Sequence, residues 1–118
     1  MHAFIIEDEY LIGQSLQDML EQLGCDEFSF ARSEDAAVQG VGNRNIDLIT
    51  ADVRLLPGDG LKAVEAICAQ RNIPVVFITG YAEELEDRAP DAIVVQKPIK
   101  EGDLESAVRR AIPGFAHN

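Results

Sequence analysis

Side chains able to do chemistry follow several short apolar segments of this 118-residue chain. In chain order they are Glu7, Asp8, Glu9, Asp52, Thr79 and Lys97. Carboxylates held close together repel one another, so a group of them needs a bound cation or shared protons. Carboxylate oxygens suit a hard cation such as Mg²⁺, which binds one or two carboxylates and keeps several waters. One carboxylate oxygen would then stay free as a nucleophile for a phosphoryl group, which Thr79 and Lys97 would hold.

The elements that must position these residues alternate along the chain as apolar runs and amphipathic helical patterns. We expect strands at Ala3–Ile6, Phe28–Ala31, Ile46–Ala51, Pro74–Thr79 and Ala92–Gln96. We expect helices over 11–23, from the cap Ser33 to 41, and over 61–68, 82–88 and 104–111. The strands are continuously apolar, as strands covered on both faces of a parallel sheet are. Right-handed crossovers then predict a doubly wound α/β sheet, whose functional site lies beyond the carboxyl ends of the strands.

Each of these polar residues also has an ordinary explanation when it is taken alone. A lone Asp at a strand end is most often a turn or cap residue, and Thr79–Gly80 is a common step from strand to loop. The acidic residues 7–9 face the dipole of the helix that follows them, which is favourable. Four strand ends that carry this set in this order are far more specific than any one of them.

The set resembles the receiver domain of bacterial two-component response regulators, and the resemblance covers nearly the whole chain. The matching residues are Glu7, Asp8 and Glu9 of the acidic pocket, the phosphoacceptor Asp52, the switch hydroxyl of Thr79, and Lys97–Pro98. The resemblance implies a flavodoxin-like fold with a five-stranded parallel sheet in the order 2-1-3-4-5. It also implies a phosphoacceptor signalling domain rather than an enzyme.

The resemblance implies a Mg²⁺ cofactor at the acidic pocket. Asp8 and Asp52 would bind the ion directly, Glu7 through a water, and Arg54 through its backbone carbonyl. Asp52 would attack the phosphorus of a phosphohistidine on a sensor histidine kinase or a histidine phosphotransferase.

Two further residues have roles that the resemblance implies. Lys97 would pair with the acyl phosphate, and the hydroxyl of Thr79 would swing toward the new negative charge. The Lys97–Pro98 peptide bond is expected to be cis, a conformation that only proline makes inexpensive.

The chain departs from the common family pattern at its switch residues. Most of the family has an aromatic on the fifth strand, in the space that the switch hydroxyl vacates, whereas this chain has Val94. Tyr81, just past Thr79, offers a substitute. The run from Phe77 to Tyr81 resembles the Phe-Ala-Thr-Gly-hydrophobic-Tyr motif of an atypical receiver subgroup in alphaproteobacteria. Many members of that subgroup have a single domain and act in general stress signalling. Here Ile78 replaces the Ala, and the Tyr follows the Gly directly.

Arg54 and Tyr81 are expected to flank the mouth of the site. An Arg stacked on a Tyr ring would shield the acyl phosphate from water, through a contact worth about 0.5–2 kcal/mol. The alternative is that both side chains point into solvent.

The composition limits the partners and the location of the protein. Ten Lys and Arg against 21 Asp and Glu give a net charge of −11, which repels nucleic acid and anionic membranes. The apolar start at residues 3–6 is far shorter than the ~20 residues of a membrane span. Cys25 and Cys68 show neither metal spacing nor a disulfide pattern, and behave as small hydrophobes. A reducing, cytoplasmic location fits this use of cysteine.

The length predicts one receiver domain over residues 1–118, with a loose tail at 113–118 and no output domain. Such a single-domain regulator would act by docking to its phosphodonor and to a downstream protein target, as a phosphoryl sink, shuttle or switch. Leu85 is the one clearly apolar residue of the helix at 82–88, so this helix is expected to pack weakly and move easily.

Three other classes compete with this interpretation. A phosphatase with an Asp nucleophile usually carries a second Asp two residues on, where this chain has Arg54. A flavin-binding domain of the same sheet order needs a phosphate-binding loop after the first strand, where the acidic residues 7–9 would repel a phosphate. A pseudo-receiver, an interaction module that is never phosphorylated, is disfavoured by the intact set of site residues.

Overall fold

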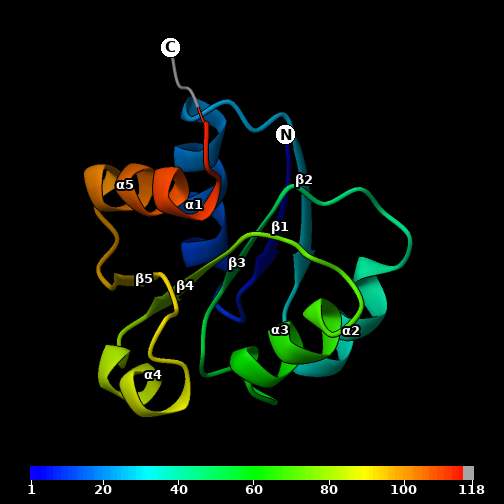
Figure 1. Cartoon of the computed structure of the whole chain (residues 1–118). Helices are drawn as coiled ribbons and strands as arrows, with labels where there is room; N and C mark the ends of the chain where they lie inside the picture. The colour runs from blue at the N-terminus through cyan, green and yellow to red at the C-terminus, as the bar shows by residue number, and fades with distance from the viewer. Residues whose placement is uncertain (116–118) are drawn as a thin grey trace.

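The computed structural model describes residues 1–115, which form five strands and five helices in alternation (Figure 1). The strands are β1 (His2–Ile6), β2 (Glu27–Ala31), β3 (Leu48–Ala51), β4 (Val75–Thr79) and β5 (Val94–Gln96). The helices are α1 (Tyr10–Gln22), α2 (Glu34–Val41), α3 (Gly60–Cys68), α4 (Ala82–Arg88) and α5 (Glu101–Ala111). All paired strands are parallel, in the order β2-β1-β3-β4-β5, which confirms the predicted flavodoxin-like doubly wound sheet.

Three strands begin one or two residues later than the apolar pattern predicts. Ile46 is buried but precedes the first ladder residue of β3. Pro74 has no N–H, although its carbonyl accepts a hydrogen bond from Ile49 N at 2.9 Å. Ala92 N donates instead to Ala89 O, within a turn. Apolar sequence reports burial, whereas a strand also needs ladder hydrogen bonds, so the predicted ends overshoot.

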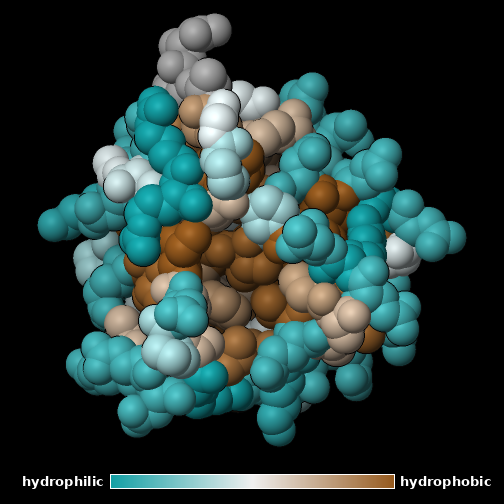
Figure 2. Space-filling model, in the orientation of Figure 1, coloured by the Kyte–Doolittle hydropathy of each residue, from teal (hydrophilic) through white to brown (hydrophobic). Residues whose placement is uncertain are grey.

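The sheet separates two hydrophobic clusters, with α2 and α3 on one side of it and α1 and α5 on the other (Figure 1). Side chains of α2 and α3 pack on one face against Phe4, Ile6 and Ile49. Side chains of α1 and α5 pack on the other face, against Ala3 and Ile5 among others. Successive strand residues point to opposite faces, which is why β1 supplies both clusters. Figure 2 shows hydrophobic side chains gathered in the middle of one view, framed by hydrophilic residues.

Backbone hydrogen bonds carry the sheet one residue past its strands at the carboxyl edge. Glu7 N donates to the carbonyl of Ala31 at 2.9 Å, and Asp52 N donates to that of Ile6 at 3.0 Å. Lys97 N donates at 2.9 Å to the carbonyl of the last residue of β4. The first residues after β1, β3 and β5 therefore leave the sheet along one edge.

The loop between β3 and α3 lies tightly against the end of β3. Gly60 N donates to Val53 O at 2.7 Å. A Cβ at Gly60 would lie only 1.7 Å from the carbonyl oxygen of Asp52, so this position requires glycine. Asp59 caps α3 by accepting a hydrogen bond from Lys62 N at 3.1 Å. The loop is therefore held close to the carboxylate that ends β3.

The end of the described chain contacts the core. Of the predicted loose tail at 113–118, residues 116–118 lie outside the described residues. Phe115 packs against the cluster under α1 and α5, and its N–H donates to Ile112 O at 3.0 Å. Cys25 is buried in the same cluster, whereas Cys68 packs half-buried on the other face, and both are free thiols. Within residues 1–115, every helix is too short or too polar to cross a membrane.

Candidate functional site

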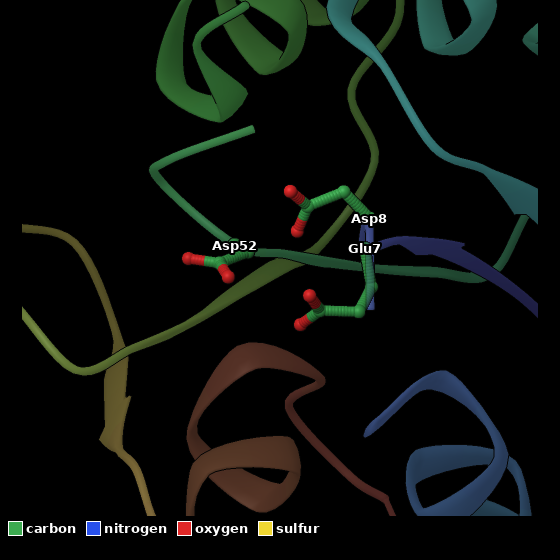
Figure 3. Close-up of side chains that lie close together, drawn as sticks. All are labelled: Glu7, Asp8 and Asp52. Atoms are coloured by element: carbon green, nitrogen blue, oxygen red, sulfur yellow. The ribbon is translucent and has the colours of Figure 1, made fainter. Parts of the chain in front are cut away.

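Three carboxylates meet at the carboxyl edge of the sheet. Glu7 and Asp8 follow β1, and Asp52 follows β3 (Figure 3). One carboxylate oxygen from each residue lies within 4.8 Å of the others. Glu7 and Asp52 are buried, whereas Asp8 is half-buried. The hydrogen bonds that continue the sheet past β1 and β3 bring these carboxylates together, although Asp52 is 44 residues or more from the other two in sequence.

Glu7 is the most enclosed of the three. Its Oε2 accepts a hydrogen bond from Glu9 N at 3.1 Å, and its Oε1 lies 3.1 Å from the Nζ of Lys97. Burial and, to a smaller extent, the negative charge of Asp52 raise the pKa of Glu7 to about 7, against the opposing effects of the Glu9 amide and Lys97. Enclosure therefore disfavours the charged form of the Glu7 side chain.

Lys97 follows β5 and contacts two of the three carboxylates. Its Nζ donates to Asp52 Oδ2 at 2.7 Å and forms the ion pair with Glu7. Burial alone would lower the pKa of Lys97, but the hydrogen bond to Asp52 and the charges of both carboxylates raise it. The ammonium therefore stays charged beside the nucleophile. The Lys97–Pro98 peptide bond is cis, the conformation that the sequence predicts.

Thr79 ends β4 at the same edge of the sheet. Its side chain is fully buried, and its hydroxyl accepts a hydrogen bond from Tyr81 N at 3.0 Å. Val94, on β5, pairs with Phe77 in the ladder and packs half-buried against the cluster under α2 and α3. The small side chain of Val94 therefore lies on β5, the strand next to the one that ends at Thr79.

Arg54 lies in the loop directly after Asp52. Its backbone N–H donates to Asp52 Oδ1 at 3.3 Å. Its guanidinium lies over the ring of Tyr81, with Cζ 3.6 Å from the ring centroid, so of the two alternatives the contact between Arg and ring is the one present. Its Nε donates to Glu84 Oε1 at 3.0 Å, and Nη2 contacts the same oxygen. The hydrogen bond between the two side chains raises the pKa of Arg54 and lowers the pKa of Glu84.

Sequence reasoning missed the partners of this loop on α4. Glu84 binds Arg54, and Arg88 forms an ion pair of 2.8 Å with Asp59. The sequence does hold one signal. Glu84 and Arg88 are four residues apart on α4, and Arg54 and Asp59, with the charges in the reverse order, are five residues apart in the loop. Without the relative placement of the two segments, that signal points to no particular pairing.

The site opens into a cavity of about 640 Å³. The residues that line it are Asp8, Glu9, Ile12, Asp52, Arg54, Leu56, Gly80, Tyr81 and Lys97. Leu56, 85% exposed, and Tyr81, 48% exposed, give this acidic cavity an apolar rim. A charged group of about the size of a phosphate can therefore reach Asp52 from solvent.

The acidic group suits a hard divalent cation. Its donors are carboxylate oxygens at distances that one ion can bridge after small movements, and Mg²⁺ prefers such oxygens together with water. The raised pKa of Glu7 fits the same conclusion, because a cation here would offset the cost of burying its charge and, to a smaller extent, the repulsion from Asp52.

Comparison with known proteins decides the family. The family model described as "Response regulator receiver domain" matches residues 3–109. The chain belongs to this family. Receiver domains are signalling domains of two-component systems, which histidine kinases phosphorylate and which bind Mg²⁺ at an acidic pocket. The match favours the receiver over the phosphatase and the flavin-binding domain.

Relatives of this receiver domain include longer regulators. It is 33% identical over 112 residues to the "Phyllosphere-induced regulator PhyR" of Methylorubrum extorquens, covering 92% of this chain and 42% of that protein. It is 32% identical over 117 residues to the "Transcriptional regulatory protein PdtaR" of Mycobacterium tuberculosis, covering 96% of this chain and 57% of that protein. The chain thus spans about half the length of these two relatives.

Among solved structures, the solution structure of the receiver domain of PhyR from Erythrobacter litoralis is similar over nearly the whole chain. Its TM-score is 0.88 at 33% identity, and the match covers 99% of this chain and 93% of that one. The receiver fold and the resemblance to PhyR-type receivers therefore agree with the interpretation of the sequence.

Proposed function

We propose that this receiver domain is a phosphoacceptor switch. Asp52 takes a phosphoryl group from a phosphohistidine on a sensor histidine kinase or histidine phosphotransferase. The observation that carries the proposal is the position of Lys97, whose ammonium lies 2.7 Å from Asp52 beside a group of three carboxylates. A buried nucleophile with a fixed cation next to it, open to a cavity, suits phosphoryl transfer because this reaction needs positioning and charge stabilisation.

In the transfer step, one carboxylate oxygen of Asp52 forms an O–P bond while the P–N bond of the phosphohistidine breaks. The imidazole nitrogen leaves with the bonding electron pair. Lys97 remains protonated and moves from Asp52 to an oxygen of the new acyl phosphate. Asp8 and Asp52 would hold Mg²⁺ directly, with Glu7 acting through a water and Arg54 through its carbonyl. When bound, the ion neutralises charge on the phosphoryl oxygens.

Switching starts at Thr79. Its hydroxyl accepts a hydrogen bond from Tyr81 N in this structure. An acyl phosphate at Asp52 adds charge of about −1.5 to −2 and new acceptor oxygens. The hydroxyl then turns to donate to a phosphoryl oxygen, and the segment that carries Tyr81 moves with it. Stacking of Arg54 on Tyr81 limits the access of water to the acyl phosphate.

The output is a change in docking of the domain, residues 1–118, to a downstream protein in the cytoplasm, with neither nucleic acid nor membrane as partner. The net charge of −11 supports a protein partner over nucleic acid. A role in general stress signalling has support from PhyR of Bartonella quintana, described as an "Anti-anti-sigma factor". That protein is 32% identical, with a TM-score of 0.82, over 93% of this chain and 46% of its own.

Intact-mass analysis after incubation with Mg²⁺ and a small acyl-phosphate donor tests this function. We expect one added phosphoryl group, lost in Asp52→Asn and without Mg²⁺, and retained in Asp18→Asn, a matched change at an exposed acid on α1. A phosphohistidine-bearing phosphotransferase serves as a second donor. No addition from either donor would favour the pseudo-receiver and overturn the proposal.

A further inference from the structure

Helix α4 is fastened to the rest of the molecule mainly by charge. Within α4, which lies wholly in the described part of the chain, Leu85 is the only buried residue. Two ion pairs instead tie α4 to the loop between β3 and α3, namely Arg54–Glu84 and Asp59–Arg88. We name these two pairs the loop–α4 bridge. Because the bridge begins two residues after Asp52, the attachment of α4 depends on charge next to the phosphoacceptor.

Arg54 stands between two possible anionic partners. Its guanidinium binds Glu84, while its side chain lines the same cavity as Asp52 and Lys97. Its backbone N–H already donates to Asp52 Oδ1, which keeps the residue next to that carboxylate. The stacked ring of Tyr81 holds the guanidinium plane at this position. Rotation of the side chain within this cavity would exchange one anion for the other.

We infer that a phosphoryl group on Asp52 takes the guanidinium of Arg54 away from Glu84 and so breaks one of the two ion pairs of the loop–α4 bridge. The inference rests on the proposed function. A phosphoryl group carries about −1.5 to −2 charge, more than a carboxylate, and its oxygens match the fork of an Arg. The Arg54–Glu84 pair is largely exposed, with side chains 56% and 35% accessible, and exposed pairs are weak. The exchange is therefore favourable, and Glu84 is the anion that occupies Arg54 before phosphorylation.

Loss of the Arg54–Glu84 pair has a structural consequence. Glu84 is left without its cation. Of the two ion pairs of the bridge, the Asp59–Arg88 pair remains, together with the buried Leu85. Arg54 is thus a positioning residue that couples phosphorylation of Asp52 to the attachment of α4. Glu84 competes with the phosphoryl group for Arg54 and so slows phosphorylation.

The test compares Glu84→Gln with Glu83→Gln, a matched change at an exposed neighbour on the same helix. The rate of phosphorylation by the small acyl-phosphate donor with Mg²⁺ is followed by intact mass. We expect Glu84→Gln to be phosphorylated about two- to fivefold faster, because a competing anion is gone. Glu83→Gln should match the parent chain. Arg54→Ala should abolish the acceleration caused by Glu84→Gln, so the double variant should be phosphorylated at the same rate as Arg54→Ala alone. In an Arg54→Lys background, Glu84→Gln should again accelerate phosphorylation in part.

Amide hydrogen exchange of α4 gives a second readout, which a purely local effect on rate would not move. Exchange in α4 should rise on phosphorylation of the parent chain and be raised already in unphosphorylated Glu84→Gln, with α5 unchanged. Equal rates and equal α4 exchange for both Gln variants would overturn the inference and leave the proposed function standing. Absence of any mass addition in the parent chain would overturn both.

Discussion

Helices α4 and α5 both contact β5, but they pack on opposite faces of the sheet and are held by different forces. α5 buries Leu104, Ala107 and Val108 in the cluster that it shares with α1. α4 buries Leu85 and depends on the loop–α4 bridge. Apolar burial is insensitive to charge at a distance, whereas exposed ion pairs respond to it. The comparison indicates that α4 is the helix that phosphorylation can release. Its attachment depends on charge, and phosphorylation of Asp52 changes the charge beside it.

The largest expected difference comes from truncating one buried Leu on each helix. Leu104→Ala should lower the free energy of unfolding by about 2–5 kcal/mol, because it empties a site in the shared core. Leu85→Ala should lower global stability less and instead release α4 locally. Chemical denaturation combined with hydrogen exchange measures both. Equal global losses, with no selective rise of exchange in α4, would show that α4 belongs to the cooperative core as fully as α5.

Two glycines sharpen the comparison. Gly60→Ala should destabilise the protein by about 1–3 kcal/mol, because of the clash with Asp52 O, and should disturb both the acidic group and the bridge. Gly102→Ala, in α5 with open space around its Cβ position, should stabilise by about 1 kcal/mol or less. Thermal unfolding gives the two shifts, and a Mg²⁺ titration should show weaker binding only for Gly60→Ala. Loss of binding in both variants would contradict this account of the loop.

A smaller effect should come from the second ion pair of the bridge. Asp59→Asn keeps a capping oxygen for α3 but removes the charge that pairs with Arg88. We expect a loss of about 0.2–1 kcal/mol in the protection of α4 amides, typical of exposed pairs. Hydrogen exchange measures it, with Glu65→Gln on an exposed position of α3 as the control. Protection that falls equally in α3 and α4 would indicate a lost cap rather than a lost bridge.

Salt should produce the smallest change. Raising ionic strength from about 0.01 to 1 M shortens the screening length from about 30 to 3 Å, which weakens the exposed pairs of the bridge. Exchange in α4 should therefore increase modestly, while exchange in α5 stays the same because its attachment is apolar. An equal response of both helices would remove the distinction drawn here.

Much of this arrangement was predictable from local patterns. Continuous apolar runs predict strands buried on both faces, and the polar residues that end them must meet because parallel strands share one carboxyl edge. The positions of Glu7, Asp8, Asp52 and Lys97 follow from this rule, whereas the stacking of Arg54 on Tyr81 was one of two alternatives that the sequence left open. The exact starts of β3, β4 and β5 were not, because burial extends beyond the ladder hydrogen bonds.

The sequence by itself determined the order of elements, the residues at the strand ends and the weakness of α4, which has a single apolar side chain to bury. Only the tertiary structure decided that Arg54 binds Glu84 and that Asp59 binds Arg88. These partners are about 30 residues apart and come from an irregular loop and a short helix. The sequence pattern of charged residues does not predict which distant residue each one pairs with. The pairing depends on how the packed core places the two segments.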